Sequence, residues 1–485
     1  MNYKAVIGIL GKTMLIEALL LLCPMFVGII YSENTYLDFL IPILALIVIG
    51  LPLTCLKSKD KSIYAKEGFV IVSLSWIILS LFGAVPFVLS GAIPNYVDAV
   101  FETVSGFTTT GASILSNVEA LPQSMLFWRS FTHYIGGMGI LVFVLAIMPK
   151  YDSGVMHVFR AESPGPSASK LVSKLTFTAR ILYGIYVVMT LVEIIMLLFG
   201  GMPLFDSVVH AFGTAGTGGF SIKNSSIAYY NSTYIEMVIA VFMFLFGINF
   251  NIFYLLLIGN FKKILKSEEL RTYLIIIVTA TLAIALNILS VTVNFGQAIR
   301  YSFFQVTSIG STTGFVTADY DQWPAFSKGI IIVLMIVGAC GGSTGGGIKA
   351  SRLVMLVKSS FADIKRLIHP RAVVPVRYEN ELLDKNTERN VHTYFTLWII
   401  IVAITTVLLC LDINDFLTNF TATLSCIGNI GPGLSNAGIG MVGPTFNFGG
   451  YSPFSKVLLS FVMLFGRLEI FPMLILFIPR TWKRG

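Results

Sequence analysis

Long apolar runs alternate with short polar turns along the whole chain. Ten of these runs are long enough to span a membrane, because about 20 apolar residues cross the ~30 Å hydrocarbon core of a bilayer. They comprise residues 12–31, 38–56, 68–91, 128–148, 178–200, 233–259, 272–293, 327–357, 393–411 and 455–478. The first run resembles a signal peptide, with Lys4 and Lys12 ahead of an apolar core, yet no small-residue cleavage site follows it. The pattern therefore predicts an all-α polytopic membrane protein.

Composition and charge placement indicate the same class. The 485 residues are 55% hydrophobic and only 12% charged, which is too apolar for a soluble protein of this size. If the N-terminus is inside, few Lys and Arg residues fall in outer segments, namely Arg129, Lys223, Arg300, Lys328 and Lys456. The others gather on the inner side, apart from Arg467 within a span, as the positive-inside rule predicts. The net charge of +8 thus reflects topology rather than nucleic-acid binding, and both termini are expected in the cytoplasm.

A repeated unit follows the first two spans. Four glycines recur about 100 residues apart, each in a polar turn between apolar runs: Gly111, Gly218, Gly314 and Gly431. Each turn follows a stretch too short to cross the membrane, and an acid opens three of these stretches: Asp98, Asp206 and Asp415. We interpret each unit as a span (M1), a re-entrant pore half-helix, a filter loop and a second span (M2). Two N-terminal helices (1–60) and four pseudo-repeats (61–150, 151–265, 266–375 and 376–485) would then surround one central pore.

The four turns are candidates for an ion filter that is lined by backbone carbonyls. Irregular backbone is tolerated inside a bilayer only where it is buried in protein or faces water. Four turns that converge meet that condition for each other, and their carbonyls then face a desolvated cation. Glycines in membrane helices also serve close helix packing, but recurrence in four repeats favours a filter. The candidate filter residues are Thr109, Thr110, Gly111, Gly216, Thr217, Gly218, Thr312, Thr313, Gly314, Asn429, Ile430 and Gly431.

The turns and two further segments carry a family resemblance. Trp128, Arg129 and Ser130 open a stretch that runs through His133 to Gly139, and residues 341–349 read Gly-Gly-Ser-Thr-Gly-Gly-Gly-Ile-Lys. With the four turns, they closely resemble the Trk/Ktr/HKT superfamily of potassium transporters over nearly the whole chain. The extra pair of spans before residue 60 resembles the TrkH branch more than the shorter KtrB branch. The resemblance implies a homodimer in the bacterial inner membrane, with one pore per protomer and a cytosolic nucleotide-binding ring of TrkA type that gates it.

The resemblance also implies potassium as the transported ion. Glycine in all four filters resembles the potassium-selective pattern of the superfamily, whereas Ser in the first filter accompanies sodium transport. This chain departs from the family pattern at Gly216, where a bulkier residue is expected, and at Ile430, which stands in place of Thr. Ile430 can still contribute its backbone oxygen to a filter. The fourth repeat, where Gly431 follows Ile430 and precedes Pro432, is therefore expected to differ most from a symmetric potassium channel.

The apolar run near residues 327–358 has an unusual glycine-rich centre, with six glycines within residues 338–347. Each glycine costs a helix about 1 kcal/mol relative to Ala, so we expect a loop at mid-membrane, below the filter. Such backbone belongs beside the aqueous pathway, and the resemblance assigns an intramembrane loop of the third repeat as the gate. A loop that only packs against neighbouring helices is the alternative. A phosphate-binding loop is excluded, because this segment lacks the Gly-Lys-Ser/Thr ending of such loops. The candidate gate residues are Gly338, Gly341, Gly342, Ser343, Thr344, Gly345, Gly346, Gly347 and Arg467.

Arg467 is the only Arg deep within a predicted span. An intramembrane cation is costly and is usually paired or faces water. One interpretation is an internal pair with Glu469 or with a helix carbonyl. The other, which the family resemblance supports, has Arg467 bind carbonyls of the glycine-rich loop and repel cations while the pore is closed.

The predicted function is potassium uptake without covalent chemistry, and a sodium-permeable or ion-coupled symporter of the same superfamily is the alternative. A membrane enzyme would need clustered His, Asp or Glu at a membrane face, and the sequence has no such cluster. Its five His and five Cys lack the spacing of metal ligands, and we expect no organic cofactor. The long basic inner loops, 149–180 and 349–391, are expected to contact either a cytosolic regulator or lipid headgroups, and the resemblance favours the regulator.

Overall fold

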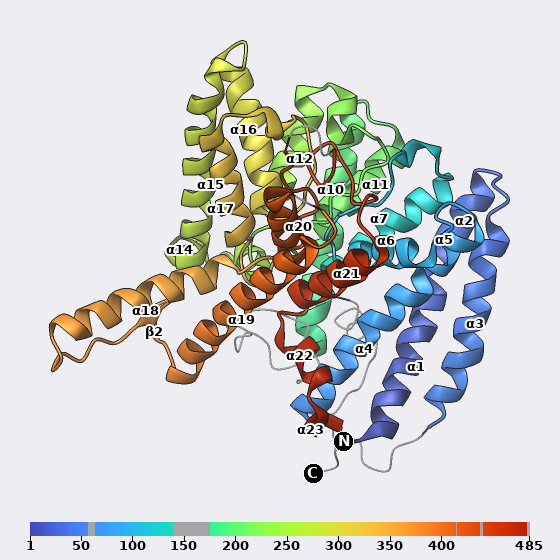
Figure 1. The fold of residues 1–485 in the computed structure, drawn as a ribbon, viewed down its shortest axis with the longest axis horizontal. Coiled ribbons are helices and arrows are strands. Elements are labelled where there is room, and N and C mark those ends of the chain that lie inside the picture. The colour runs from blue at the N-terminus through green and yellow to red at the C-terminus, as the bar shows by residue number, and fades with distance from the viewer. Residues whose placement is uncertain (57–63, 140–174, 414, 437–439, 483–485) are drawn as a thin grey trace.

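The computed structural model describes residues 1–485 apart from 57–63, 140–174, 414, 437–439 and 483–485 (Figure 1). The described chain is mostly helical. Its strands are β1 (Arg377–Tyr378) and β2 (Glu381–Leu382), which pair antiparallel as a short hairpin. The second half of the span expected at 128–148 lies outside the described residues.

Two helical spans precede the repeats and lie at one edge of the molecule beside α4 (Ala65–Gly83), as Figure 1 shows. The first is interrupted at Leu21 and consists of α1 (Tyr3–Leu20) and α2 (Leu22–Ile30), and the second is α3 (Tyr36–Thr54). Glycines let α1 and α3 approach closely, since a Cβ on Gly11 would lie 2.9 Å from the Gly50 carbonyl oxygen.

Each of the four repeats combines an M1 helix, a pore half-helix and an M2 helix. The M1 helices are α4 with α5 (Val85–Leu89), α10 (Leu175–Phe199), α15 (Glu268–Asn287) with η3 (Ile288–Ser290), and α19 (Lys385–Leu409). The half-helices are α6 (Tyr96–Phe107), α11 (Leu204–Gly216), α16 (Phe295–Gly310) and α20 (Phe416–Gly428). The M2 helices are α7 (Gln123–Gly137), α12 (Thr233–Phe246) with α13 (Phe250–Leu257), α17 (Ala325–Val337) with α18 (Ala350–Ile368), and α21 (Pro453–Arg467) with α22 (Phe471–Phe477). Short connecting helices are η1 (Val118–Ala120), η2 (Ser226–Tyr230), α14 (Phe261–Lys266), η4 (Tyr320–Gln322) and α23 (Pro479–Trp482).

Side chains cap three of the four half-helices, whereas α11 begins after Pro203 without a side-chain cap. Asp415 caps α20 by accepting a hydrogen bond from the Thr418 amide at 2.9 Å, and Asn95 caps α6 in the same way. The other two predicted acids are each the third residue of their helices. Asp98 pairs with Lys456 at 2.7 Å, and Asp206 accepts a hydrogen bond from the Tyr230 hydroxyl at 2.7 Å. These contacts hold the half-helices to neighbouring segments at their outer ends.

The M2 helices of the second and fourth repeats are broken as well as that of the third. The axes of α12 and α13 differ by 92°, and residues 468–470 separate α21 from α22 with positive φ at Glu469 and Ile470. The hydropathy pattern predicts uninterrupted spans at 233–259 and 455–478, and this prediction is wrong at both places. Hydropathy missed the breaks because the broken segments stay apolar in composition. Backbone of the third repeat bonds to the first break, whereas the amides of residues 468–470 bond back to carbonyls of α21. Among the described helices, six are long and apolar enough to cross a membrane, or seven if α12 and α13 count as one span.

The two described termini lie at the same end of the molecule, as Figure 1 shows. The Tyr3 hydroxyl donates a hydrogen bond to the Trp482 carbonyl, and Lys66 donates to the Arg480 carbonyl at 3.2 Å. This packing places the start and the end of the described chain on one side of the helix bundle.

The close contact between α1 and α3 leads to a stability prediction. Gly11→Ala adds a methyl group 2.8 Å from the Leu53 Cβ and 2.9 Å from the Gly50 carbonyl oxygen, and such overpacking typically costs about 1–3 kcal/mol. Gly8→Ala on the same helix is the matched control, because the atom nearest to its new methyl group, the Leu56 carbonyl oxygen, would be 3.7 Å away. We expect the thermal unfolding midpoint of purified protein to fall for Gly11→Ala and to stay unchanged or rise slightly for Gly8→Ala. Equal midpoints for the two variants would contradict this packing.

Candidate functional site

All four pore half-helices end in the same backbone turn. The residue after each helix, or one further on, adopts left-handed φ: 55° at Thr109, 54° at Thr217, 64° at Thr312 and 54° at Asn429. The next amide donates back across the turn in each repeat, as in a Schellman motif, over 2.8–2.9 Å: Thr110 to Ser105, Gly218 to Gly213, Thr313 to Ser308 and Ile430 to Ser425. The repeated geometry aligns the four segments residue by residue.

This alignment changes the register of the second repeat. Two residues after each left-handed position stands a glycine with positive φ: Gly111 at 79°, Gly219 at 77°, Gly314 at 85° and Gly431 at 101°. Gly219 therefore occupies the position that the sequence pattern assigned to Gly218. The pair Gly218-Gly219 offers both choices to a sequence alignment, and only the backbone angle at Thr217 separates them. Gly218 corresponds instead to Thr110, Thr313 and Ile430. Among the four aligned glycines, two therefore follow Thr, whereas three would do so if Gly218 stood in place of Gly219.

The four segments contact one another in a closed ring. A Cβ built on each of the first three glycines would overlap a carbonyl oxygen of the next repeat: Gly218 for Gly111, Thr313 for Gly219 and Ile430 for Gly314. A Cβ on Gly431 would lie 2.9 Å from the Thr110 carbonyl oxygen, which closes the ring onto the first repeat. Both the positive φ and the lack of space require glycine here. The ring brings together the predicted filter residues of all four repeats, while Gly216 packs against the His133 backbone of α7.

The ring holds strained residues in place. A β-branched residue with positive φ is a genuine outlier that costs about 1–3 kcal/mol and persists only where surrounding structure enforces it. Thr312 accepts a hydrogen bond from the Gly346 amide at 2.6 Å, and the Asn429 side-chain amide donates to Thr110 Oγ1 at 2.9 Å. Thr109 Oγ1 is buried and has no hydrogen-bond partner among the described residues. Strain of this kind is typical of functional sites.

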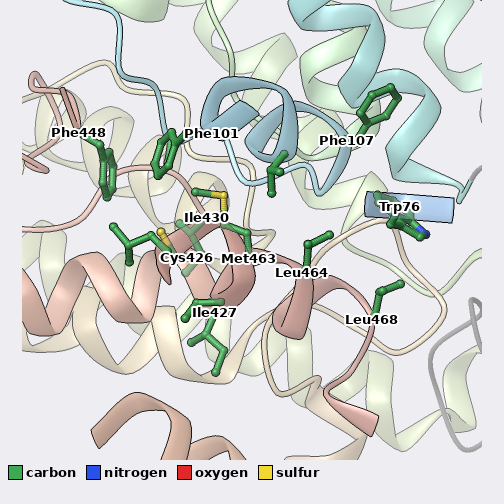
Figure 2. Packing of buried hydrophobic residues seen from close by; sticks show 14 of the residues in the cluster. Trp76, Phe101, Phe107, Cys426, Ile427, Ile430, Phe448, Met463, Leu464 and Leu468 are labelled. Carbon is green, nitrogen blue, oxygen red and sulfur yellow. The ribbon is translucent and has the colours of Figure 1, made fainter. Parts of the chain in front are cut away.

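Ile430 does not place its side chain in the ring. Figure 2 shows Ile430 beside Cys426 and Met463 within the packed apolar core, where Ile430 is fully buried. Its carbonyl oxygen is the atom that faces Gly314. The substitution of Ile for Thr therefore changes the packing behind the ring and leaves a backbone oxygen at the ring itself.

A small vestibule adjoins the ring on the side of the residues that follow its glycines. This cavity of about 170 Å³ is lined by segments of all four repeats, including Gly111, Gly219, Gly314 and Gly431. Asp321, in the loop after the third glycine, accepts a hydrogen bond from the Ser435 amide at 3.1 Å and so fastens the loop of the fourth repeat. Burial raises the pKa of Asp321 to about 6, which leaves the carboxylate mostly charged at neutral pH.

The glycine-rich segment forms a loop directly below the ring, as expected. The Gly346 amide binds Thr312 of the ring, and a Cβ on Gly345 would lie 2.6 Å from the Ser311 carbonyl oxygen. The loop also fills the break between α12 and α13: the Cys340 amide donates to the Gly247 carbonyl, and the Phe250 amide donates to the Gly342 carbonyl, both at 3.0 Å. The candidate gate residues 338–347 thus lie together between the ring and the broken helices.

Arg467 binds backbone carbonyls of two repeats. Its guanidinium donates to the Thr344 carbonyl of the loop at 2.7 Å and to the carbonyls of Gly136 and Gly137 at 2.5 and 2.7 Å. Glu469, the partner considered in the first interpretation, forms an ion pair with Arg352. The contacts with Gly136 and Gly137, the last residues of α7, agree with the helix-carbonyl form of the first interpretation. The contact with Thr344 agrees with the second, in which Arg467 binds the loop.

Sequence reasoning missed three charged residues around this loop. Lys349 is 3% exposed and donates to the Gly345 carbonyl, while Glu269 accepts hydrogen bonds from the Gly341 amide at 2.6 Å and the Ser351 amide at 3.2 Å. Arg352, the third of these residues, lies in the first turn of α18. Lys349 closes the glycine-rich segment in sequence, which is a signal that could have found it. Glu269 begins an M1 helix far away in sequence, and only the fold brings it to the loop.

The whole chain has relatives of known class. Residues 37–484 match the TrkH family, described as cation transport proteins. The chain is 34% identical to the Trk system potassium uptake protein TrkH of Escherichia coli K12 over 100% of both chains. It is 31% identical to the Trk system potassium uptake protein TrkG of the same strain over 99% of both. The crystal structure of the potassium transporter TrkH from Vibrio parahaemolyticus matches it with a TM-score of 0.88 and 30% identity, over 100% of both chains.

The chain belongs to the TrkH family of cation transport proteins. The resemblance drawn from the turns is thereby confirmed. The structural match likewise confirms the fold class of a multi-pass helical membrane protein. TrkH-family members are transport proteins and not enzymes, which agrees with the absence of covalent chemistry from the predicted function.

The register of the second repeat can be tested with one methyl group. In Gly219→Ala the new Cβ overlaps the Thr313 carbonyl oxygen at a φ of 77°. Gly201→Ala imposes a similar φ of 83° but meets nothing within 4 Å, which makes it the matched control for backbone strain alone. We expect Gly219→Ala to lose more than about tenfold of cation uptake at equal membrane abundance, a loss of about 1.4 kcal/mol or more, and Gly201→Ala to retain most of it. Equal uptake by the two variants would remove Gly219 from the ring.

Proposed function

We propose that this chain carries out potassium uptake across the bacterial inner membrane, with the ring as its selectivity filter. The closed contact ring of four repeats carries the proposal, because it gathers backbone carbonyls where a membrane protein otherwise avoids irregular backbone. The filter would comprise residues 109–111, 217–219, 312–314 and 429–431. The relatives that are named potassium uptake proteins support the choice of ion.

Backbone electrostatics explain why the ring would bind a cation. The half-helices α6, α11, α16 and α20 all end at the ring, so their partially negative C-terminal ends converge there. Carbonyl oxygens can replace the hydration shell of a potassium ion, which makes entry into the ring nearly neutral in free energy. Transport then needs only binding and release. Sodium permeation or coupling to a second ion is the alternative, and the rescue experiment below separates them.

The loop of residues 338–347 would act as the gate. It lies on the far side of the ring from the vestibule and is held there by Arg467, Lys349 and Glu269. A cationic guanidinium below a cation filter opposes the passage of cations, and its three carbonyl bonds also keep the loop in place. Opening would require the loop and Arg467 to separate.

A cytosolic regulator would drive that separation. Figure 1 shows α18 and α19 projecting together from the helix bundle. The projection carries the exposed basic residues Lys365, Arg371 and Arg389, and α18 begins directly after the loop. We propose that a nucleotide-binding ring of TrkA type docks on this projection and moves α18, and that the transporter works as a homodimer with one pore in each protomer. The projection gives such a regulator a rigid connection to the gate.

Growth and uptake in a host that lacks potassium uptake test the proposed function. Expression of the chain with its regulator should restore growth at low external potassium and rubidium uptake. Excess sodium should compete weakly, because the carbonyl ring is predicted to favour the larger ion. Failure of rescue at every external potassium concentration would refute the proposal. Strong competition by sodium, or uptake that requires sodium or a proton gradient, would favour the symporter.

Removal of the cation at the gate should increase flux. Arg467→Gln loses the charge below the ring and weakens the bond to the Thr344 carbonyl. We expect a several-fold rise in rubidium uptake in the absence of the regulator, equivalent to about 1 kcal/mol of gate destabilisation. Arg300→Gln is the control. The Arg300 guanidinium forms an ion pair with Glu236 over 2.6 Å, and it does not contact the loop. Unchanged uptake and unchanged dependence on the regulator in Arg467→Gln would exclude Arg467 from the gate.

A further inference from the structure

One position behind the ring does the same task in three repeats. Nine residues before the ring glycine, a polar side chain of the half-helix binds the segment that follows that glycine. Glu102 accepts hydrogen bonds from the Ile114 amide and the Ser113 hydroxyl, both at 2.9 Å, and His210 Nε2 bonds to the Ser221 hydroxyl at 2.9 Å. Gln305, with its side-chain amide turned so that the oxygen accepts, receives the amides of Thr317 at 2.8 Å and Ala318 at 3.2 Å.

In the fourth repeat a different residue of the half-helix binds the segment that follows the ring glycine. Ala422 occupies this position and offers no polar group. The preceding residue, Thr421, takes over, because its hydroxyl accepts a hydrogen bond from the Leu434 amide at 3.0 Å and bonds to the Leu434 carbonyl at 2.8 Å. Every repeat thus fastens its exit segment to its half-helix, but the chemistry of the fastener differs in each.

Among the residues that the structure describes, the first repeat alone uses an ion pair for this purpose. Arg129 of α7 donates to the Glu102 carboxylate at 2.8 Å, and the two side chains are 2% and 0% exposed. The same guanidinium donates to the Ser221 carbonyl at 3.2 Å and lies 4.1 Å from the centre of the Phe220 ring. Both contacts are with the second repeat, directly after its ring glycine. The pair therefore fastens the exit segments of two adjacent repeats at once.

A histidine one turn along α7 completes the support of the second repeat. His133 Nδ1 bonds to the Gly106 carbonyl at 2.7 Å, which assigns the proton to that nitrogen. Nε2 can then accept the hydrogen bond from the Phe220 amide at 3.3 Å, and the two rings lie 4.2 Å apart. Phe220 is held between Arg129 and His133, so its position depends on the side chain that Glu102 orients.

We propose that the Glu102–Arg129 pair is a positioning brace that sets the spacing of the ring between the first and second repeats, and thereby its preference for potassium over sodium. The inference rests on the proposed function, because it concerns the selectivity of the same ring. A carbonyl ring rejects the smaller ion only if it resists collapse around it. A paired, fully desolvated charge gives that resistance, since moving either partner leaves a buried charge uncompensated. The neutral fasteners of the other repeats lack this penalty.

Two neutral variants and their combination test the brace in the full chain with its regulator. Glu102→Gln and Arg129→Gln each remove the ion pair, and the double variant removes it without leaving a stray buried charge. Rubidium uptake with sodium as competitor gives the potassium-over-sodium preference independently of protein abundance. We expect the potassium-over-sodium preference to fall about tenfold in each single variant and to stay at least threefold below wild type in the double variant. The double variant tests the brace even if a single variant does not fold.

Glu236→Gln is the matched control. It breaks the ion pair of buried Glu236 with half-buried Arg300, which also joins an M2 helix to a half-helix but does not touch the segments after the ring glycines. We expect lower thermal stability with an unchanged ion preference. Wild-type preference in the double variant, or an equal loss in Glu236→Gln, would overturn the brace. No potassium uptake by the wild-type chain would instead overturn the proposed function.

Discussion

Irregular backbone at the centre of an apolar protein must find all its hydrogen-bond partners within the chain, and this constraint governs the whole structure. Water cannot satisfy these groups in the bilayer core, where each unpaired one costs several kcal/mol. Four half-helix ends that meet in one ring meet this constraint jointly, because their amides bond back to their own half-helices and each segment packs against the carbonyl of the next repeat. One such turn alone would be untenable. The fourfold repetition is therefore a physical requirement of the turn as well as a trace of its origin.

The same constraint explains the layer beneath the ring. The breaks in α12–α13 and in α17–α18 exchange hydrogen bonds with each other, through Cys340 with Gly247 and Phe250 with Gly342. Charged side chains form hydrogen bonds with the remaining backbone groups according to their charge. The carboxylate of Glu269 accepts hydrogen bonds from backbone amides, while Lys349 and Arg467 donate hydrogen bonds to backbone carbonyls. A loop held by a few charged groups, and not by a regular helix, has a second arrangement within reach whenever those charges find other partners.

The sequence predicts the spans, the half-helices, the turns and the glycine-rich loop, because hydropathy and glycine content are local properties. It does not predict that Gly219 and not Gly218 completes the ring, since two adjacent glycines are equivalent until the φ of Thr217 is known. The break at 468–470 was missed although its amides bond back to carbonyls of α21 itself. The break at 247–249 was also invisible, because its backbone partners come from the third repeat. Glu269 and Arg352 were missed for the same reason. What sequence reasoning loses is pairing between distant segments.

The repeats are alike in backbone at the ring and unlike in the side chains behind it. The side chain of Ile430 lies in the apolar core, and its carbonyl takes the same place as those of Gly218 and Thr313. The fourth repeat still differs most at the ring, because Gly431 has a φ of 101° and its Cβ would lie 2.9 Å from the next carbonyl oxygen, against 2.0 Å in the other three repeats. A further asymmetry lies in the fasteners: a carboxylate in the first repeat, an imidazole in the second, an amide in the third and a hydroxyl in the fourth. A ring of identical carbonyls can be stiff on one side and compliant on another only through such supports. Side chains behind the ring can therefore set its ion preference as well as the residues within it.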